Sequence, residues 1–150
     1  MNNNNHINYN RTTSLGQLSG SIFNLLKKEL QLQFDNRSIP LKVEYFPIIN
    51  RLLEQDQVPQ QTIAEWFGYD RPRTSRIIDE LEKSGFVTRK DDPESRRTKL
   101  VCLSDYTKRN EKLIIQAIES SFETAYKGMS KVEIINSIES MKKIKNNLNR

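Results

Sequence analysis

The chain has 150 residues and a net charge of +5 at neutral pH, which favours one domain with a polyanionic partner. A single cysteine excludes an internal disulfide, and a single histidine, His6, excludes most histidine-based catalysis and most zinc sites. The five glycines form no phosphate-binding loop and the apolar runs are too short to span a bilayer. We therefore expect a protein that is not an enzyme, holds no metal or cofactor and has no membrane partner.

The N-terminal residues 1–13 are rich in asparagine and predict a flexible tail. They lack the apolar segment of a secretory signal, so we expect a cytoplasmic protein. Residues 14–150 are predicted to form a single domain. Its first helix begins with an S-x-x-Q capping motif, Ser14 to Gln17, and ends near the sequence FDNRSIP. The apolar stripe of this helix is made by Leu15, Leu18, Ile22, Leu25, Leu26 and Leu30.

Three shorter helices are predicted next. EYFPIINRLLEQ forms the first, and Pro47 requires it to start late or to kink. The second helix, QQTIAEWFG, is predicted to begin after Pro59 and to end at Gly68. Asp70 is a good N-cap for the third helix, which ends at Lys83 before Gly85, a residue suited to a left-handed C-cap.

After Gly85 the apolar period changes from that of a helix to that of a strand. FVTRK and TKLVCL are β-rich segments around the polar DDPESRR, which predicts a two-stranded hairpin with a long tip. A long helix follows Ser104, Gly128 interrupts it, and an S-x-x-E capping box at Ser130 starts the last helix. The expected fold is mainly α with a small β-wing. A winged helix-turn-helix at 44–104 is flanked by dimerisation helices at 14–37 and 105–150.

The helix after Asp70 is the candidate recognition helix. Thr74, Ile77, Ile78 and Leu81 share its inner face. Its outer face begins with cations and small polar groups that suit base edges and phosphates in a major groove. The residues predicted to contact DNA on this helix are Arg71, Pro72, Arg73, Ser75 and Arg76.

A solvated surface is the alternative interpretation of this helix. Asp79, Glu80 and Glu82 would repel DNA, and Asp79 is spaced to pair with Arg76 at i, i+3. The hairpin favours DNA binding, because cations on a protruding tip can enter a minor groove. The wing cations predicted to contact DNA are Arg96, Arg97 and Lys99.

The middle of the chain resembles the MarR family of multiple antibiotic resistance regulators. The family pattern L-E-x-x-G-[LF]-[IV] appears as LEKSGFV at 81–87. Its wing pattern D-P-x-D-R-R-[ST] appears as DPESRRT at 92–98, and V-x-L-[TS] as VCLS at 101–104. The resemblance implies a homodimer on a palindromic operator, with control by a small ligand or by oxidation. It also implies that Arg97 is the wing arginine of the minor groove.

Ser95 departs from the family pattern, which usually has an aspartate there to hold the wing arginine. Glu94 is the neighbouring residue that could substitute for it. Cys102 invites comparison with members that sense peroxide, although those use a thiol near the first helix; the alternative is a small strand residue. Phe23, Tyr45 and Phe46 are the candidate lining of a cavity for a small aromatic ligand, together with Trp66, and plain core is the alternative.

The sequence therefore predicts a dimeric, sequence-specific, DNA-binding transcriptional regulator, a repressor that a small ligand releases. Its partners would be double-stranded DNA and a second copy of the chain. The competing hypothesis is a winged-helix module for protein–protein contact, with a basic wing that is only solvated.

Overall fold

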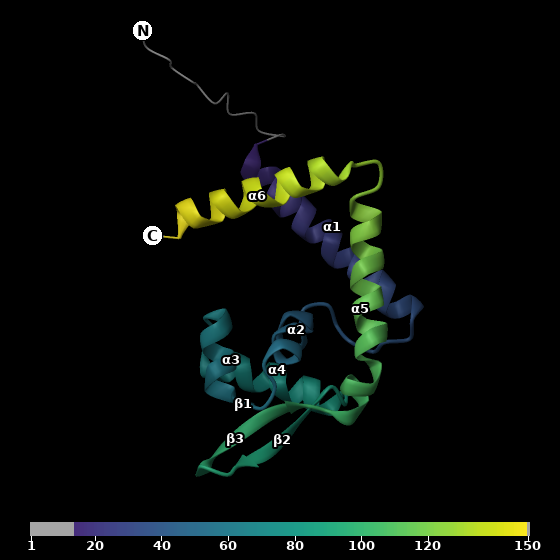
Figure 1. The fold of residues 1–150 in the computed structure, drawn as a ribbon. Helices are drawn as coiled ribbons and strands as arrows, with labels where there is room; N and C mark the ends of the chain where they lie inside the picture. The colour runs from purple at the N-terminus through teal and green to yellow at the C-terminus, as the bar shows by residue number, and fades with distance from the viewer. Residues whose placement is uncertain (1–13, 150) are drawn as a thin grey trace.

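The computed structural model describes residues 14–149, without the side chain of Arg96; the predicted tail at 1–13 lies outside this range. The chain is mainly helical with one small sheet (Figure 1), as the sequence predicted. The elements in chain order are α1 (Leu15–Asn36), α2 (Phe46–Glu54), β1 (Val58–Pro59), α3 (Gln60–Phe67), α4 (Arg71–Lys83), β2 (Val87–Asp92), β3 (Ser95–Leu103), α5 (Asp105–Ala125) and α6 (Lys131–Leu148).

The sheet is antiparallel and has three strands in the order β1-β3-β2. The predicted two-stranded hairpin is confirmed as β2 and β3, but a third strand was not predicted: Val58 and Pro59 pair with Val101 and Leu100 of β3. The prediction that DDPESRR is a long loop was wrong. Pairing of β2 with β3 continues to Asp92 and Ser95, and an ion pair between Asp91 and Lys99 crosses the strands there. The hairpin is therefore longer and its turn tighter than predicted.

Capping groups fix the ends of α4. The side chain of Asp70 accepts a 2.7 Å hydrogen bond from the backbone N–H of Arg73, as predicted for an N-cap. At the other end, Gly85 has φ +80°, the left-handed conformation predicted for it. Gly68 ends α3 in the same conformation with φ +62°. Pro47 occupies the first turn of α2, so that helix starts late.

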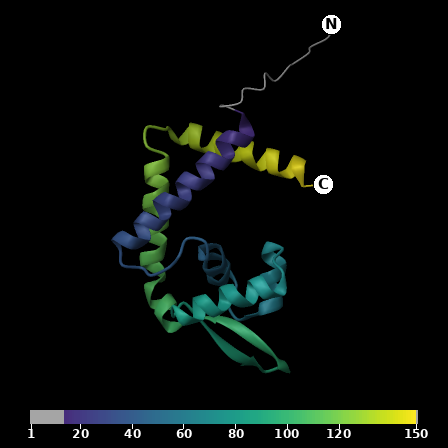
Figure 2. The ribbon, with the colours of Figure 1, turned by 180° about the vertical axis from the view of Figure 1, so that it is seen from behind.

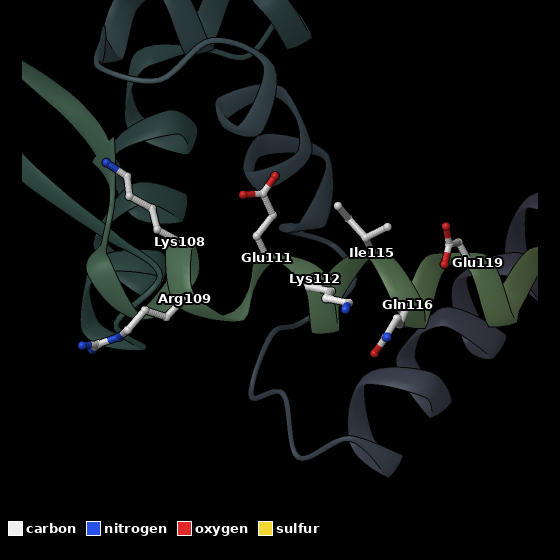
Figure 3. Close-up of a pocket in the computed structure, with 7 residues that line it drawn as sticks. All are labelled: Lys108, Arg109, Glu111, Lys112, Ile115, Gln116 and Glu119. Carbon is white, nitrogen blue, oxygen red and sulfur yellow. The ribbon is translucent and has the colours of Figure 1, made fainter.

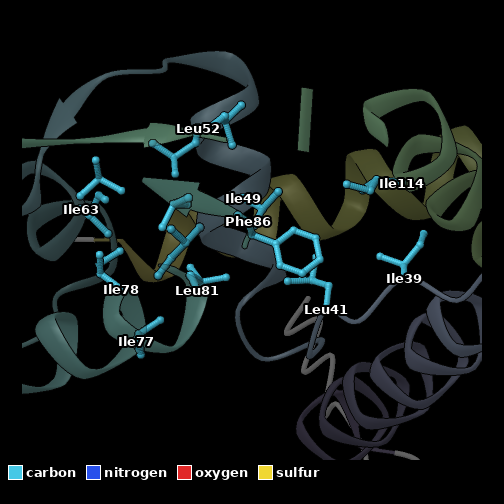
Figure 4. Close-up of a cluster of buried hydrophobic side chains, with 14 of the residues drawn as sticks. Ile39, Leu41, Ile49, Leu52, Ile63, Ile77, Ile78, Leu81, Phe86 and Ile114 are labelled. Atoms are coloured by element: carbon cyan, nitrogen blue, oxygen red, sulfur yellow. The ribbon is translucent and has the colours of Figure 1, made fainter. Parts of the chain in front are cut away.

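The core joins α2, α3, α4 and the sheet (Figure 4). Ile49, Leu52, Ile63, Ile78 and Phe86 are fully buried and converge from these elements. All four residues predicted on the inner face of α4 are buried, which confirms that prediction. The inner face of α4 is thereby fixed against the core, and its outer face is directed to solvent.

Asp56, between α2 and β1, connects the sheet to α5. One carboxylate oxygen accepts the N–H of Leu103 at 2.7 Å, and the other lies 2.9 Å from Nζ of Lys108. Burial tends to raise the pKa of Asp56, but hydrogen bonds from Leu103, Lys108 and Gln57 outweigh it and lower the pKa. The start of α5 is thus tied to the end of β3.

Ser104 caps α5 by accepting the N–H of Thr107 at 3.1 Å. The Thr107 hydroxyl is buried and donates to the carbonyl of Phe86 at 2.7 Å. These bonds reinforce the connection that Asp56 makes, so the first turn of α5 is held against the winged-helix core from two sides.

The terminal helices lie at the opposite end of the molecule from the wing (Figures 1 and 2). α1 packs on α5, where the Arg37 guanidinium donates to the Ser120 hydroxyl at 2.8 Å. No residue of α6 is buried. Large apolar side chains are exposed along α1 and α6: Leu15, Leu18, Ile22, Phe23, Leu25, Leu32, Val132, Ile135, Ile138, Met141 and Leu148. Within residues 14–149, no helix has the length and apolar character needed to cross a bilayer.

Candidate nucleic-acid interface

The N-terminal half of α4 carries the predicted helix contacts on its outer side. Arg71, Pro72, Arg73 and Arg76 are exposed, and Ser75 is half-buried. Thr74 turns inward, where its hydroxyl donates to the carbonyl of Asp70 at 2.8 Å. The structure therefore gathers these five predicted residues on one exposed helical end.

The arginines on this helix differ in their surroundings. The guanidinium of Arg73 lies over the ring of Tyr69, a residue that the sequence analysis did not select. Within the described part of the chain, Arg76 forms no ion pair. The predicted pairing of Asp79 with Arg76 was wrong, because Asp79 lies 2.6 Å from Nη2 of Arg89. Strand β2 runs back beside α4 and brings Arg89 within reach.

Arg89 is the centre of a polar cluster that joins three elements. Its guanidinium contacts Asp79 and Glu82 of α4 and, at 3.4 Å, the side-chain oxygen of Gln60 at the start of α3. Its backbone N–H also donates to Glu82 at 3.1 Å. Burial tends to lower the pKa of Arg89, but the two carboxylates outweigh it and raise the pKa. We call Arg89, Asp79, Glu82 and Gln60 the Arg89 cluster.

The wing presents its cations in different ways. Arg97 is exposed on β3, whereas Lys99 is engaged with Asp91. The side chain of Arg96 lies outside the described part of the structure. The Ser95 hydroxyl accepts from Thr98 at 2.9 Å. Glu94 uses its backbone N–H to bond Asp92 at 2.9 Å, and among the described residues it forms no ion pair with Arg97. The substitution by Glu94 considered above is therefore not found.

A cavity of about 440 Å³ opens between α1 and α4, beside the recognition helix. Phe23 and Phe46 line it, as predicted; Tyr45 packs against the core and is not among the lining residues, and Trp66 lies under Arg51. The sequence analysis missed the charged part of the lining, which includes Lys27 and Glu44, 3.6 Å apart. The complete lining is Phe23, Leu26, Lys27, Leu30, Val43, Glu44, Phe46, Pro47, Tyr69 and Arg73.

A second hollow runs along the surface of α5 (Figure 3). Every residue that lines it comes from this one helix, with Lys108, Glu111 and Glu119 on one side of the ribbon and Arg109 on the other. It is a groove between neighbouring side chains, and within residues 14–149 no second element contributes to its lining. Its lining is Lys108, Arg109, Glu111, Lys112, Ile115, Gln116 and Glu119.

Cys102 lies on β3 and is fully buried. Burial raises the pKa of its thiol, and the charge of Asp56 raises it further. A reactive thiol needs the opposite conditions, namely exposure and a lowered pKa. The environment of Cys102 is therefore that of a small core residue. No cluster of metal-ligating side chains occurs within residues 14–149.

These features define the class of protein. An exposed recognition helix, a preceding short helix and a sheet with a protruding hairpin make a winged helix-turn-helix protein. Residues 44–99 match the model of the MarR family. Residues 44–99 are therefore a MarR-family domain, and the family resemblance found in the sequence is confirmed.

Solved structures share this fold over nearly the whole chain. The transcriptional regulator SlyA is 24% identical, with a TM-score of 0.76, and the match covers 91% of this chain and 94% of SlyA. A MarR family regulator from Listeria monocytogenes, complexed with a 26mer DNA, is 26% identical, with a TM-score of 0.74 and coverage of 90% and 89%. PcaV from Streptomyces coelicolor, in complex with its natural ligand, is 17% identical, with a TM-score of 0.71 and coverage of 92% and 96%. No curated protein matches the chain.

Proposed function

We propose that this MarR-family protein represses transcription as a homodimer that binds a palindromic operator. The observation that carries the proposal is the outer side of α4, where Arg71, Arg73, Ser75 and Arg76 are presented while the inner side is fixed in the core. Arginine can form bidentate bonds with guanine in the major groove. Arg97 on the wing is positioned to enter the adjacent minor groove.

Dimerisation is supported by the apolar surface of the terminal helices. Val132 is 65% exposed and Phe23 is 63% exposed, on helices at the end of the molecule away from the wing. An apolar surface this extensive is rare on a soluble monomer and marks an interaction site. A second copy that covers α1 and α6 would bring two recognition helices to one face of DNA.

Control by a small ligand is supported by the cavity beside α4. Phe23 and Phe46 provide apolar walls, while Lys27 and Arg73 provide cations for a polar group of the ligand. PcaV, which has the same fold, is solved with its natural ligand. Because Arg73 belongs both to the cavity lining and to the exposed end of α4, an occupied cavity would compete for a DNA-contacting side chain and release the operator.

Selection of duplexes from a random library by the purified protein tests the proposal. We expect an inverted repeat with half-sites roughly 10 base pairs apart from centre to centre. The affinity for the selected duplex should fall steeply as salt concentration rises. If the selection recovers no sequence, or if the affinity does not depend on salt, the competing hypothesis of a protein–protein module is favoured. The acidic groups on α4 are the feature that supports this alternative.

A further inference from the structure

The recognition helix carries opposite charges along its length. Its N-terminal half presents Arg73 and Arg76, whereas its C-terminal half carries Asp79 and Glu82. Asp79 follows Arg76 by three residues, so the helix rises only about 4.5 Å between them. Charges this close lie within the Debye length of roughly 10 Å at 0.1 M salt. Carboxylates at these positions would therefore oppose the phosphates that the arginines attract.

Both carboxylates are engaged by one residue of the wing. Arg89 contacts Asp79 through Nη2 at 2.6 Å and Glu82 through Nη1. The side chain of Arg89 is 23% exposed, against 62% for Asp79. The guanidinium is thus committed to its partners, and it is the counter-charge beside a carboxylate, Asp79, that stays mostly exposed.

The cluster also keeps Asp79 from pairing with Arg76. At i, i+3 on a helix, Asp79 is within reach of Arg76, yet the structure directs Asp79 toward β2. Lys83 is exposed at the end of α4 and Lys90 follows Arg89 on β2, so the surrounding surface is cationic. Asp79 and Glu82 of the cluster, together with Glu80 on the same helix, interrupt this positive surface.

We propose that Arg89 is a positioning residue for DNA binding, which offsets part of the negative charge of Asp79 and Glu82 and leaves Arg76 free for the major groove. This inference rests on the proposed function. It assigns a role to a cation that touches no DNA itself, since the guanidinium is occupied by three acceptors on two helices. The positive charge that Arg89 adds beside the two carboxylates, rather than the shape of the arginine, is the property that DNA binding requires.

Four proteins separate this role from direct contact and from a purely structural effect. They are the wild type, Arg89→Gln, Arg89→Lys, and the triple variant Arg89→Gln/Asp79→Asn/Glu82→Gln. Binding to a labelled duplex of random sequence is measured at low and at moderate salt, where non-specific binding reports phosphate attraction. Circular dichroism of each protein confirms that it has the helix content of the wild type.

We expect Arg89→Gln to bind roughly three- to tenfold more weakly at low salt, with a smaller loss at higher salt. Arg89→Lys retains the charge and should stay near the wild-type affinity. The triple variant removes all three charges and should recover the affinity that Arg89→Gln loses. Arg51→Gln is the matched control, because it removes an arginine from an ion pair with Glu54 on α2, away from the predicted contacts.

Given a wild type that binds DNA, two results would overturn the inference. If the triple variant stays as weak as Arg89→Gln, Arg89 contacts DNA or supports the wing by its shape. If Arg89→Lys binds as weakly as Arg89→Gln, charge is not the property that matters. A wild type that binds no duplex at any salt concentration refutes the proposed function and the inference with it. Binding by the wild type without rescue refutes the inference alone.

Discussion

The guanidinium carbon of Arg73 lies 3.8 Å from the centroid of the Tyr69 ring, close enough for a cation–π contact. Both residues line the cavity between α1 and α4. Among the described residues 14–149, Arg76, one turn further along the same helix, has no aromatic partner, and its side chain is exposed. Arg73 and Arg76 of the recognition helix therefore differ in their surroundings, and substitutions should distinguish them.

Replacement of Arg76 by alanine should cost about 1–3 kcal/mol of binding free energy per half-site and relax the preference at one base position. Arg73→Ala should cost less, because Arg73 must first leave Tyr69, a contact worth about 0.5–1 kcal/mol at an exposed site. Titration of selected duplexes with single base changes measures both effects. An equal loss on every sequence from Arg76→Ala would make Arg76 a phosphate contact.

The wing should respond to a different property of DNA. Arg97→Ala should weaken binding most on operators with A·T-rich flanks, whose narrow minor groove attracts arginine. The slope of the logarithm of affinity against the logarithm of salt concentration should become shallower by about one unit for each phosphate-equivalent contact removed. Affinities on A·T- and G·C-flanked duplexes at two salt concentrations measure this. If Arg97→Ala binds every duplex like the wild type, the wing does not touch DNA.

Ser95→Asp tests whether the orientation of Arg97 limits binding. Ser95 is bonded to Thr98 and cannot hold a guanidinium by charge. If orientation is limiting, the aspartate should tighten binding to A·T-flanked sites although it adds negative charge near DNA. Weaker binding to all sites would show that only charge matters. Glu94→Gln is the control for the effect of charge at the turn.

The homodimer should depend on the apolar side of α6. Ile138→Asp places a charge on that side and should shift the hydrodynamic mass at micromolar concentration toward the monomer. Asn136→Asp is the matched control, because Asn136 lies on the opposite side of the helical wheel and should leave the mass unchanged. A wild type with the mass of a monomer would contradict the dimer, and so would an unchanged mass for Ile138→Asp.

Acid should weaken the connection between the sheet and α5. The pKa of Asp56 is lowered in the folded protein, so its contribution is present above the unfolded pKa and is lost as pH falls through the folded pKa. Asp56→Asn should lower the free energy of unfolding at pH 7, and the difference from the wild type should shrink toward pH 3. Denaturation at several pH values measures this. A difference independent of pH would show that the charge of Asp56 does not stabilise the fold.

Cys102 should be protected in the native state. Burial and a raised thiol pKa predict slow alkylation by iodoacetamide at pH 7, and fast alkylation once denaturant unfolds the chain. Mass spectrometry over time measures the two rates. Fast modification of the folded protein, with loss of DNA binding, would support the redox control that family members suggest and contradict the role of a small core residue.

Local signals in the sequence were sufficient for the helices and their ends. Asp70 and Gly85 were identified because an N-cap and a left-handed C-cap require particular residue types. The inner face of α4 followed from helical periodicity. Strand β1 was missed because two residues, Val58 and Pro59, carry no periodicity and become a strand only by pairing with β3.

The candidate site was less predictable, because its contacts depend on tertiary structure. Helical spacing paired Asp79 with Arg76, whereas the return of β2 along α4 supplies Arg89. Tyr69 directly precedes the N-cap and was overlooked as a partner of Arg73. The cations on the outer side of α4 were predicted, but the partners that orient them were not.

The attachment of α5 to the sheet through Asp56, Ser104 and Thr107 has a mechanical consequence. A helix fixed at its first turn acts as a rigid lever, and its 21 residues span roughly 30 Å. If the far end of α5 tilts by only a few degrees, the attached winged-helix core rotates with it, and the recognition helix moves. In a dimer joined through α1 and α6, the angle of α5 would set the distance between the two recognition helices, and therefore which operator spacing the protein accepts.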